Sequence, residues 1–466
     1  MGKFLTIASA TYAALSLQAA TVDSVTVTQD WPWSNEITVT YELSGTGGEA
    51  VNVTPTFYSG TVQLPAPEPG AASIKGELCG LRADKTYSFT LDPAKAFPSY
   101  KAAIADFKVK LTATAAPANI DEALYRIYDI KDGSCEDVTR ADLLNGKYGA
   151  YETDYGKIGR GFTTELSDVL IWTGVTNGTL YKTDKLVMRK IHAAGVVWQC
   201  GDPEGAKTGG CSRQTQKYIR LTQDFYIGVF ELTQYQMRTV DADSSTFPDD
   251  CRPAETFGGW RLYGHPDMQY KGVITGEPIN WPTNSYLRDA DSTWFMGVWR
   301  KRTKIEFDVA TAAEWEFACR GGNATPLYSG KEQTEANACE LGWCNSNAEG
   351  STHPVGEKAP NAFGLYDMLG NVEEYVHNVG NAYNSLTGSG TEDDPYVDPV
   401  GSYTISNRMC MGGSWSVAAG AFGYWQDLRF GAGTAWHSWH FPKDFSGGRV
   451  VCPATANGQW GVHPVK

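Results

Sequence analysis

The chain has 466 residues and a formal net charge of −14, with a sequence pI near 5.0. This length exceeds one average domain and allows two or three hydrophobic cores. The acidic balance, with no segregated basic patch, argues against a nucleic-acid partner because a polyanion would be repelled. Trp and Tyr are frequent, at 15 and 24 residues, and fit large aromatic cores as well as protein or carbohydrate contacts.

The first twenty residues, MGKFLTIASATYAALSLQAA, are typical of a secretory signal. Lys3 supplies the positive charge, Phe4–Leu17 the apolar core, and Ala19 and Ala20 the small residues for cleavage. The apolar run is too short for a membrane span, and no other segment is long and apolar enough to be transmembrane. We therefore expect an exported soluble protein that is secreted, periplasmic or at the cell surface.

Residues 21–114 are expected to form a β-sandwich. Short runs with period-two alternation or β-rich composition, separated by turn residues, predict strands. They are Val25–Thr28, Ile37–Tyr41, Val51–Phe57, Ser73–Leu78, Tyr87–Leu91 and Ala105–Leu111. This pattern indicates a small sandwich of fibronectin type III or immunoglobulin type, a kind of domain that usually serves as a spacer or docking module.

A linker at Ala115–Pro117 opens a connecting segment, residues 115–179, which is expected to pack on the main domain at 180–466. Strands are predicted at Lys185–Lys190, Tyr218–Leu221, Asp224–Glu231 and Ile305–Val309, and helices after Thr233, over Asn284–Arg302 and after Thr311. Thr311 and Glu314 form a capping box, and this helix should end before Gly321. From Gly321 onward the sequence shows no helix signal, so a long irregular half is expected.

Ten cysteines suit an oxidising compartment. Cys200 with Cys211, and Cys339 with Cys344, are local candidates for disulfides, although sequence alone does not fix the connectivity. The spacings do not match a zinc site, because no CxxC pair has a matching second half.

Three blocks, in order, resemble the formylglycine-generating enzyme (sulfatase-modifying factor) family. They are DFYIGVFELTQYQM at Asp224–Met237, TAAEWEFACRGG at Thr311–Gly322, and THPVGEKAPNAFGLYDMLGNVEEYV at Thr352–Val376, which is followed by GGSW at Gly412–Trp415. The third block is the most specific because many family positions occur together. The resemblance covers roughly residues 180–452 and implies an irregular variant of the C-type lectin fold, so the expected fold class is α+β, with the sandwich followed by this domain.

The resemblance also implies one calcium site, carried by Asp367, Gly370, Val372 and Glu374. Calcium takes six to eight oxygen ligands, and a tight glycine-containing turn can present two carboxylates and two backbone carbonyls. The alternative is a turn that Asp367 and Glu374 merely cap. The second calcium site of the family does not align clearly, and Asn345 and Asn347 are weak candidates for it.

The catalytic residues of the family are missing. Formylglycine-generating enzymes carry two copper-binding cysteines shortly after GGS[YW], whereas this chain continues SVAAGAFGYWQDLRFG after Trp415, without a cysteine. Thiolates are the soft ligands that copper(I) needs, so copper is not expected. Cys410 and Cys452 flank the region and resemble a disulfide more than a ligand pair.

Iron is not expected either. A related branch, the sulfoxide synthases, holds iron with histidines, but this chain lacks an HxxxHxE helix. His437 and His440 form an HxxH pair for which Asp427 or Asp444 could be imagined as a third ligand. Without an assigned third ligand, polar residues of a binding surface explain the pair better.

The segment after GGSW is rich in aromatic residues spaced by Gly, Ala and Ser. Aromatic side chains with small residues between them make rigid, amphipathic contact surfaces. The candidate ligand-binding residues are Phe422, Tyr424, Trp425, Trp436, His437, Trp439, His440 and Phe441. The alternative is a packed aromatic core in a divergent member of the family.

This tail also resembles the variable region of retroelement-diversified proteins of the same fold, on Ala419-Gly420-Ala421-Phe422 after GGSW and on Gly448-Arg449 near the end. Three functions remain open: a secreted, non-catalytic protein that binds a protein or glycan ligand, an oxidative protein-modifying enzyme with another metal arrangement, and an adhesive or structural surface protein. We favour the first, since a fold alone does not give chemistry.

Overall fold

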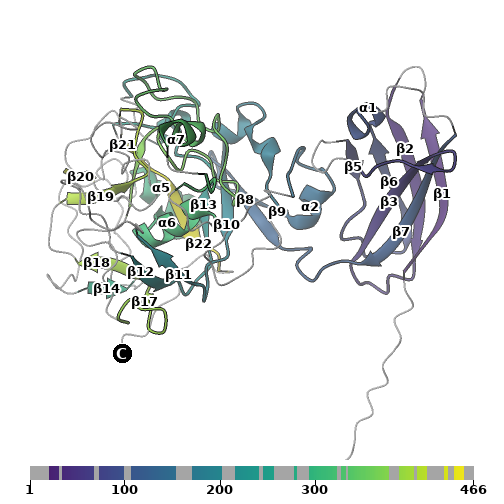
Figure 1. The fold of residues 1–466 in the computed structure, drawn as a ribbon, viewed down its shortest axis with the longest axis horizontal. Helices are drawn as coiled ribbons and strands as arrows, with labels where there is room; N and C mark the ends of the chain where they lie inside the picture. The colour runs from purple at the N-terminus through teal and green to yellow at the C-terminus, as the bar shows by residue number, and fades with distance from the viewer. Residues whose placement is uncertain are drawn as a thin grey trace, which may run out of the picture. The chain divides into compact units, whose positions relative to one another are not determined.

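The computed structural model divides into two compact units, and each is described by itself. The first is Met1–Glu122 with Arg140–Lys147, and the second is Ala123–Thr139 with Tyr148–Lys466 (Figure 1). Strands predominate over helices in both, so the chain is α+β. The structure describes residues 20–30, 34–67, 73–98, 106–153, 170–201, 216–240, 245–256, 278–280, 293–322, 327–331, 334–376, 388–402, 407–416, 435–438 and 446–455.

The first unit contains two β-sheets with a common core (Figure 1). One sheet has the order β1 (Thr21–Gln29), β2 (Ile37–Ser44), β6 (Lys85–Leu91), β5 (Ile74–Gly76), and the other β4 (Val62–Gln63), β3 (Val51–Ser59), β7 (Phe107–Ala115). Alternate side chains of β2 and β6 point inward and bury Val39, Tyr41 and Phe89. The strands predicted from alternation are confirmed, and a short helix, α1 (Pro93–Ala96), follows β6.

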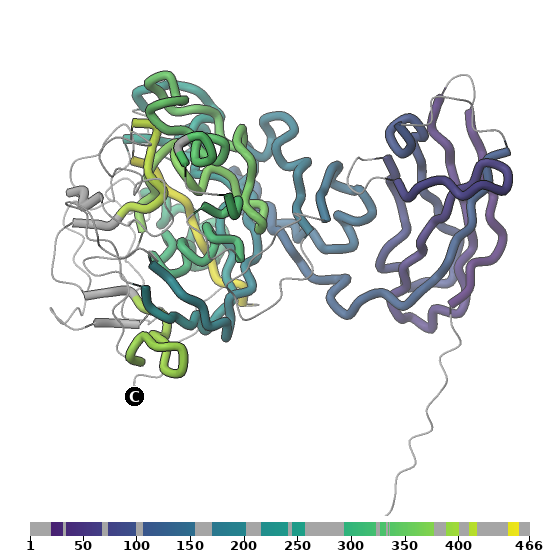
Figure 2. Tube along the Cα trace, in the orientation of Figure 1, coloured from purple at the N-terminus to yellow at the C-terminus, as the bar shows by residue number. Residues whose placement is uncertain are grey.

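The main sheet of the second unit has six antiparallel strands. Their order is β15 (Asp308–Val309), β22 (Val450–Pro453), β13 (Phe225–Gly228), β10 (Lys185–Ile191), β8 (Ala123–Asp129) and β9 (Cys135–Thr139). The expected connecting segment thus supplies β8 and β9, and also α2 (Arg140–Leu144) of the first unit. Strand β22, drawn in yellow in Figure 2, lies between β13 and β15, so a strand near the C-terminus completes the sheet.

The described residues of this unit form three further, smaller sheets. Their orders are β20 (Ala435–Ser438), β19 (Asn407–Met411), β16 (Glu373–Tyr375), β21 (Ser446–Gly447); β11 (Val197–Cys200), β12 (Lys217–Arg220), β17 (Tyr396–Val397); and β14 (Pro278–Asn280), β18 (Pro399–Ser402). The first of them positions the site. It joins the end of the family motif, in β16, to strands before and after the aromatic segment.

The described helices of the second unit are short. They are α3 (Gln234–Arg238), α5 (Phe295–Thr303), α6 (Ala312–Arg320), α7 (Glu335–Leu341) and the 3₁₀ turns η1 (Thr173–Thr176) and η2 (Leu180–Lys182). The capping box of Thr311 and Glu314 is confirmed, and α6 ends at Gly321 in the left-handed conformation. Of the helix expected over 284–302, α5 lies in the last part, and residues 281–292 lie outside the described residues.

The expectation of no helix beyond Gly321 is wrong, because Thr334 caps α7. That helix spans seven residues and buries Ala338 and Leu341, which is too short a pattern to show a helical period. Among the described residues, no helix is both long and apolar enough to cross a membrane.

Candidate metal and ligand-binding sites

The turn from Asp367 to Glu374 is fixed by its backbone. Asp367, Gly370 and Asn371 all have positive φ, at 54°, 77° and 60°. A Cβ atom at Gly370 would collide with the backbone of Trp343, so only glycine fits there. The Asn371 amide donates to the Trp343 carbonyl at 2.9 Å, and the Gly370 amide donates to the Gly412 carbonyl at 2.9 Å. The turn is therefore held between the loop after α7 and the GGSW segment.

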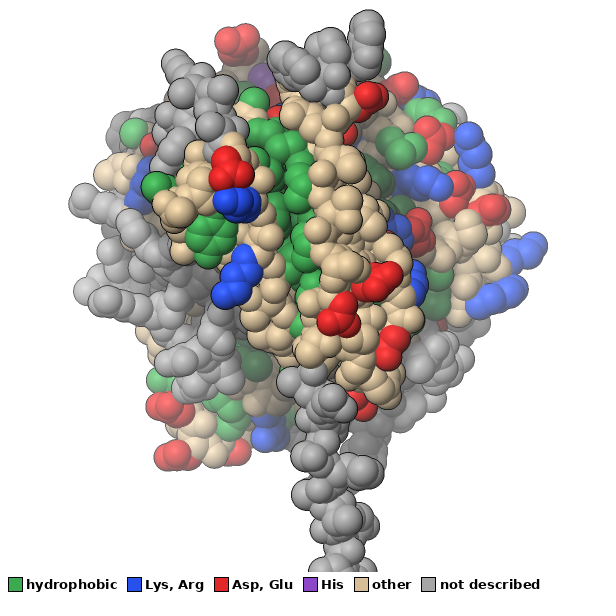
Figure 3. Space-filling model, turned by 90° about the vertical axis from the view of Figure 1, so that its right-hand side faces the viewer, with side chains coloured by type: hydrophobic (Ala, Val, Ile, Leu, Met, Phe, Trp, Pro, Cys, Tyr) green, Lys and Arg blue, Asp and Glu red, His purple; other side chains and the backbone are tan. Residues whose placement is uncertain are grey.

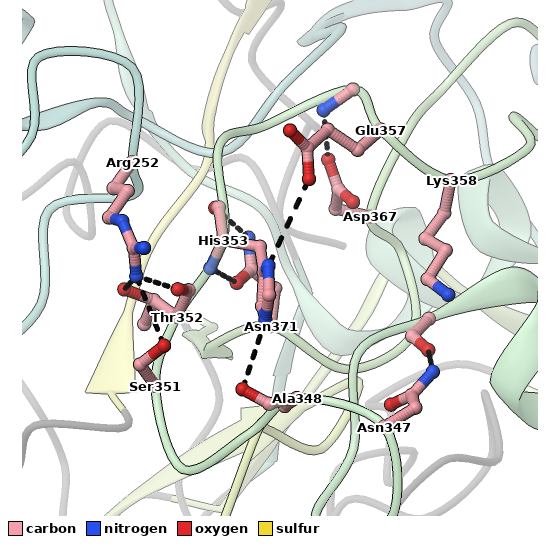
Figure 4. Close-up of polar contacts among 12 residues, drawn as sticks. Arg252, Asn347, Ala348, Ser351, Thr352, His353, Glu357, Lys358, Asp367 and Asn371 are labelled. Carbon is pink, nitrogen blue, oxygen red and sulfur yellow. Dashed lines mark hydrogen bonds and ion pairs between the residues drawn. The ribbon is translucent and has the colours of Figure 1, made fainter.

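Asp367 is the carboxylate of this turn with an unengaged oxygen. Its side chain is buried, and Oδ2 accepts a hydrogen bond from the Gly356 amide at 2.6 Å (Figure 4). Oδ1 is buried without a hydrogen-bond partner. Burial raises the pKa of Asp367 to about 6, against the opposing effects of the Gly356 hydrogen bond and of Arg449. A buried oxygen of this kind is costly unless a cation or donor approaches it.

Glu374, the other expected carboxylate ligand, is already engaged. Arg449 donates to it from Nη2 at 2.8 Å and from Nε at 3.1 Å, and Trp315 Nε1 donates at 2.7 Å. Both charged side chains are buried, and Arg449 also donates to the Gly228 and Tyr366 carbonyls at 2.8 and 2.7 Å. Arg449 thus links the family motif to strand β13 of the main sheet.

A third carboxylate, Glu231, lies in the same cluster and was not predicted. It accepts from the Val372 amide at 3.1 Å and from Asn371 Nδ2 at 2.8 Å. Burial raises the pKa of Glu231 well above its usual range, and the nearby Asp367 and Glu374 raise it further. Its position in the first family block was the only sequence signal for it.

Asn371 organises the loop beside the turn (Figure 4). Its Oδ1 accepts from the His353 amide at 2.9 Å, and its Nδ2 donates to the His353 carbonyl at 3.1 Å. The His353 ring stacks on Trp343 with centroids 3.7 Å apart, and Lys358 Nζ lies 3.8 Å from the Trp343 ring centroid. His353, isolated in the sequence, is therefore part of a packed polar network.

Only one of the two carboxylates expected to bind calcium has an oxygen without a hydrogen-bond partner. Asp367 offers an unengaged oxygen, whereas Glu374 shares its charge with Arg449. Gly370 and Val372 can add only backbone carbonyls to a set that needs six to eight oxygens. Within the described ranges, no group of three or more His, Cys, Asp or Glu side chains is arranged to hold a metal ion. Any calcium here would depend on Asp367, backbone carbonyls and water.

The aromatic segment is anchored at both ends. On its N-terminal side, β19 leads into GGSW, where the Trp415 amide donates to the Asn371 carbonyl at 2.8 Å and the Trp415 ring packs edge-on against Phe247. On its C-terminal side, β21 pairs with β16, and Arg449 follows two residues later. Both ends of the segment thus make backbone contacts with the turn from Asp367 to Glu374, called the motif turn below.

Two of the predicted ligand-binding residues fall on a described strand. Trp436 and His437 lie on β20, opposite Met409 and Arg408 of β19. The others lie outside the described residues: Phe422, Tyr424, Trp425, Trp439, His440 and Phe441. The segment therefore returns to the sheet of the motif turn in its later part.

The cysteines flanking the segment are separate buried thiols. Cys410 lies beside Glu373, and burial together with this carboxylate raises the pKa of Cys410 well above the usual range. Cys452 Sγ lies 3.9 Å from the Tyr128 hydroxyl, and burial raises its pKa to about 12. The sulfurs of Cys339 and Cys344 are 3.0 Å apart, whereas Cys211, the expected partner of Cys200, lies outside the described residues.

Similar known proteins fall into two groups. A curated relative, the chaperone protein LppX of Paenibacillus barcinonensis, is 26% identical over 202 residues, covering 37% of this chain and 68% of LppX. The formylglycine-generating enzymes of Mus musculus and Streptomyces coelicolor are 30% and 34% identical over 117 and 118 residues. Each of these two matches covers 23% of this chain, and they span only 30% and 35% of the two enzymes.

Two solved structures also match part of this chain. Treponema denticola variable protein 1 is 22% identical with a TM-score of 0.39, covering 58% of this chain and 95% of that protein. PvdO from Pseudomonas aeruginosa is 21% identical with a TM-score of 0.38, covering 57% and 94%. The model of the sulfatase-modifying factor enzyme 1-like domain matches residues 193–453, which is more than half of the chain. The chain therefore belongs to the sulfatase-modifying factor enzyme 1-like family.

Proposed function

We propose that this chain is a secreted, non-catalytic protein that binds a protein or glycan ligand through the segment between Trp415 and Ser446. The observation that carries the proposal is a cysteine-free, aromatic-rich segment whose two ends are attached to one buried turn. A segment with both ends fixed loses less conformational entropy when it binds a ligand, and aromatic side chains lose little because they have few rotatable bonds. The domain frame would be the C-type lectin fold that the family resemblance implies.

Copper-dependent oxidation is the weaker alternative. The family's copper ligands are two thiolates after GGSW, and this chain has no cysteine between Trp415 and Ser446. Cys410 and Cys452 are poor substitutes, because burial raises the pKa of both thiols and disfavours the thiolates that bind metal. The family membership keeps the enzyme alternative open for testing.

The segment is further proposed to be hypervariable, as in retroelement-diversified proteins. Support comes from the sequence outline, with GGSW and AGAF at its start and Gly448-Arg449 at its end. A reverse transcriptase gene beside a near-identical template repeat in the genome would establish diversification. A neighbouring sulfatase gene without such a repeat would favour the enzyme alternative.

A structural calcium at the motif turn is also proposed. Glu231, Asp367 and Glu374 are three buried carboxylates near one buried guanidinium, that of Arg449. The unengaged Oδ1 of Asp367 is where a cation would relieve this excess of negative charge. Its role would be to hold the turn, not to carry out a reaction.

Export to an oxidising compartment predicts a disulfide between Cys339 and Cys344. The two sulfurs already lie 3.0 Å apart in the loop after α7. Intact-mass measurement of the secreted protein, with and without reductant after thiol alkylation, tests the pair. Alkylation of both cysteines without prior reduction would exclude the bond.

The binding proposal is tested on glycan and protein arrays with wild type, Trp436→Ala and Trp439→Ala. Tyr58→Ala, which removes a partly exposed aromatic side chain from the first unit, is the matched control. We expect a ligand whose binding both Trp variants abolish and the control preserves, with all four proteins melting cooperatively. Normal binding by both Trp variants, or loss of their melting transitions, would remove these residues from the site.

Metal content separates the two functions. Stoichiometric copper or iron in the purified protein, together with oxidation of a cysteine-containing sulfatase peptide, would favour the enzyme and overturn the binding proposal. We expect neither.

A further inference from the structure

Strand β1 is an edge strand with apolar side chains left in solvent. It pairs with β2 on one side, and no described strand pairs with its other side. Val25 and Val27 are 40% and 38% exposed, although they alternate with Thr26 and Thr28 as core-facing residues should. Only polar or β-branched uncharged residues occur from Ser24 to Gln29, so this run lacks the charges that usually protect an edge.

Strand β7 is the matching edge of the other sheet. It pairs with β3 alone among the described strands, and it lies beside β1. Its inward residues Phe107, Val109, Leu111 and Ala113 pack against the core but remain partly exposed. Among the described residues, therefore, no further strand pairs with the two sheets along this side.

Figure 3 shows the result as a continuous stripe of hydrophobic side chains on one face. We call the surface formed by Val25 and Val27 of β1 with the inward side chains of β7 the β1–β7 seam. Monomeric soluble proteins seldom leave a contiguous apolar stripe open beside unpaired strand edges, since both favour association.

We propose that the β1–β7 seam is a self-association surface, on which two copies of this chain pack face to face about a two-fold axis. The seam offers the same apolar strip on each copy, with Val25, Val27 and Val109 beside Phe107, Leu111 and Ala113. A two-fold interface uses the same patch twice and so needs no second surface. This inference concerns the first unit and is independent of the ligand-binding proposal.

The charges beside the seam select the orientation. Exposed Lys108 and Lys110 lie on β7, with Asp106 paired to Lys108, whereas exposed Asp23 and Glu42 lie on β1 and β2. Figure 3 likewise shows basic side chains, with an acidic one beside them, along one side of the stripe and acidic side chains along the other. A two-fold axis parallel to the seam places β1 of one copy opposite β7 of the other, so that unlike charges meet. An axis across the seam would oppose like charges.

The bulge at Asp23–Val25 limits the length of the contact. Ser24 has φ of 35°, and the β1–β2 register shifts there, so the regular part of β1 runs from Val25 to Gln29. A contact of about five residues per strand is smaller than a standard stable interface, so the dimer should exchange with monomer in the micromolar range, on the order of 10 µM.

Sedimentation equilibrium of the whole chain tests the proposal. The salt concentration should be about 0.15 M, at which charge interactions are screened beyond about 8 Å. Val25→Lys and Val27→Lys put a charge on the seam. Val62→Lys is the matched control, because Val62 is 62% exposed on β4, at the opposite edge of the β4-β3-β7 sheet. We expect a wild-type dimer, at least tenfold weaker association for the two seam variants, and no change for the control.

Lys110→Glu should weaken the dimer several-fold, and Lys110→Arg should leave it intact. Circular dichroism and melting confirm that each variant is folded, as expected for substitutions at exposed edge positions. A wild-type protein that sediments as a monomer up to about 100 µM overturns the proposal. Equal dissociation by Val62→Lys and Val25→Lys overturns it too, because the effect would then not belong to the seam.

Discussion

The two units place their charged side chains in opposite ways. Among the described residues of the first unit, Arg140 is the one charged side chain that is buried, and ion pairs such as Arg82–Asp121 lie in solvent. The second unit buries a larger set, which includes Glu231, Asp308, Glu314, Glu316, Arg320, Asp367, Glu374 and Arg449. Buried charged side chains are therefore concentrated in the second unit, whose chain is irregular, and not in the first unit, which is built from regular strands.

The difference follows from where the backbone finds its hydrogen bonds. Long paired strands satisfy many amides and carbonyls of the first unit within their own ladders, and Asn145 accepts from the Leu78 and Cys79 amides outside them. In the second unit, side chains take over this role. Asn361 alone donates to the Ala318 and Cys319 carbonyls and accepts from the Phe363 and Leu365 amides. Irregular chain can be buried only when such side chains replace the missing ladder.

Removing Arg449 should produce the largest effect. Arg449→Ala leaves Glu374 buried beside Glu231 and Asp367 with no guanidinium, and breaking a buried pair costs about 3–5 kcal/mol. Urea denaturation of the purified chain, followed by tryptophan fluorescence, measures the loss. The matched control is Arg82→Ala, whose ion pair with Asp121 is exposed and should contribute less than about 1 kcal/mol. Equal losses in both variants would contradict the contrast between the units.

A substitution at Asn371 tests whether side-chain hydrogen bonds take the place of missing backbone–backbone hydrogen bonds. Asn371→Ala removes its bonds to Glu231 and to both backbone groups of His353, and it also places alanine at φ of 60°. We expect a loss of about 3 kcal/mol in the free energy of unfolding.

Asn371→Gly separates the two causes, because glycine accepts this φ without strain but lacks the amide. The glycine variant should recover only about 1 kcal/mol of the loss. Full recovery by glycine would mean that the side-chain network contributes little.

Calcium should stabilise the second unit by a somewhat smaller amount. At about 100 times the dissociation constant, a ligand that binds only the folded state adds about 2.7 kcal/mol, which raises the melting temperature by several degrees. Differential scanning calorimetry with calcium and with chelator measures this shift. Asp367→Asn, which removes the charge but keeps the size, should abolish it. An unchanged melting temperature in the wild type would exclude the site.

Local features were the ones that could be predicted from the sequence. Alternation predicted the sandwich strands, and the capping box of Thr311 and Glu314 predicted the start of α6, because both depend on neighbouring residues. The pairing of Glu374 with Arg449 joins residues 75 positions apart, and nothing in the local pattern of either one specifies the other. Glu231 escaped prediction for the same reason, and its role appears only when three distant segments meet.

The smallest effect, counted per pH unit, is a pH dependence from Glu314, a buried residue of the α6 capping box. Burial raises its pKa from 4.5 to about 8, against the opposing hydrogen bonds from the Thr311 amide and hydroxyl. Between these values the unfolded chain has released the proton and the folded chain keeps it. The stabilising contribution is therefore complete below pH 4.5 and is lost as the pH rises toward 8, by at most about 1.4 kcal/mol per pH unit.

Glu314→Gln keeps an acceptor for the Thr311 amide but cannot titrate, so its unfolding free energy should fall less steeply over this range. Asp367 and Glu231 also have raised pKa values and contribute a slope of the same sign to both proteins, so the difference between wild type and variant isolates Glu314. Glu77→Gln, at an exposed carboxylate of the first unit, should leave the slope unchanged. Parallel curves for wild type and Glu314→Gln would show that burial of this carboxyl does not set the pH dependence, and the contrast between the two units would then depend on the Arg449 cluster alone.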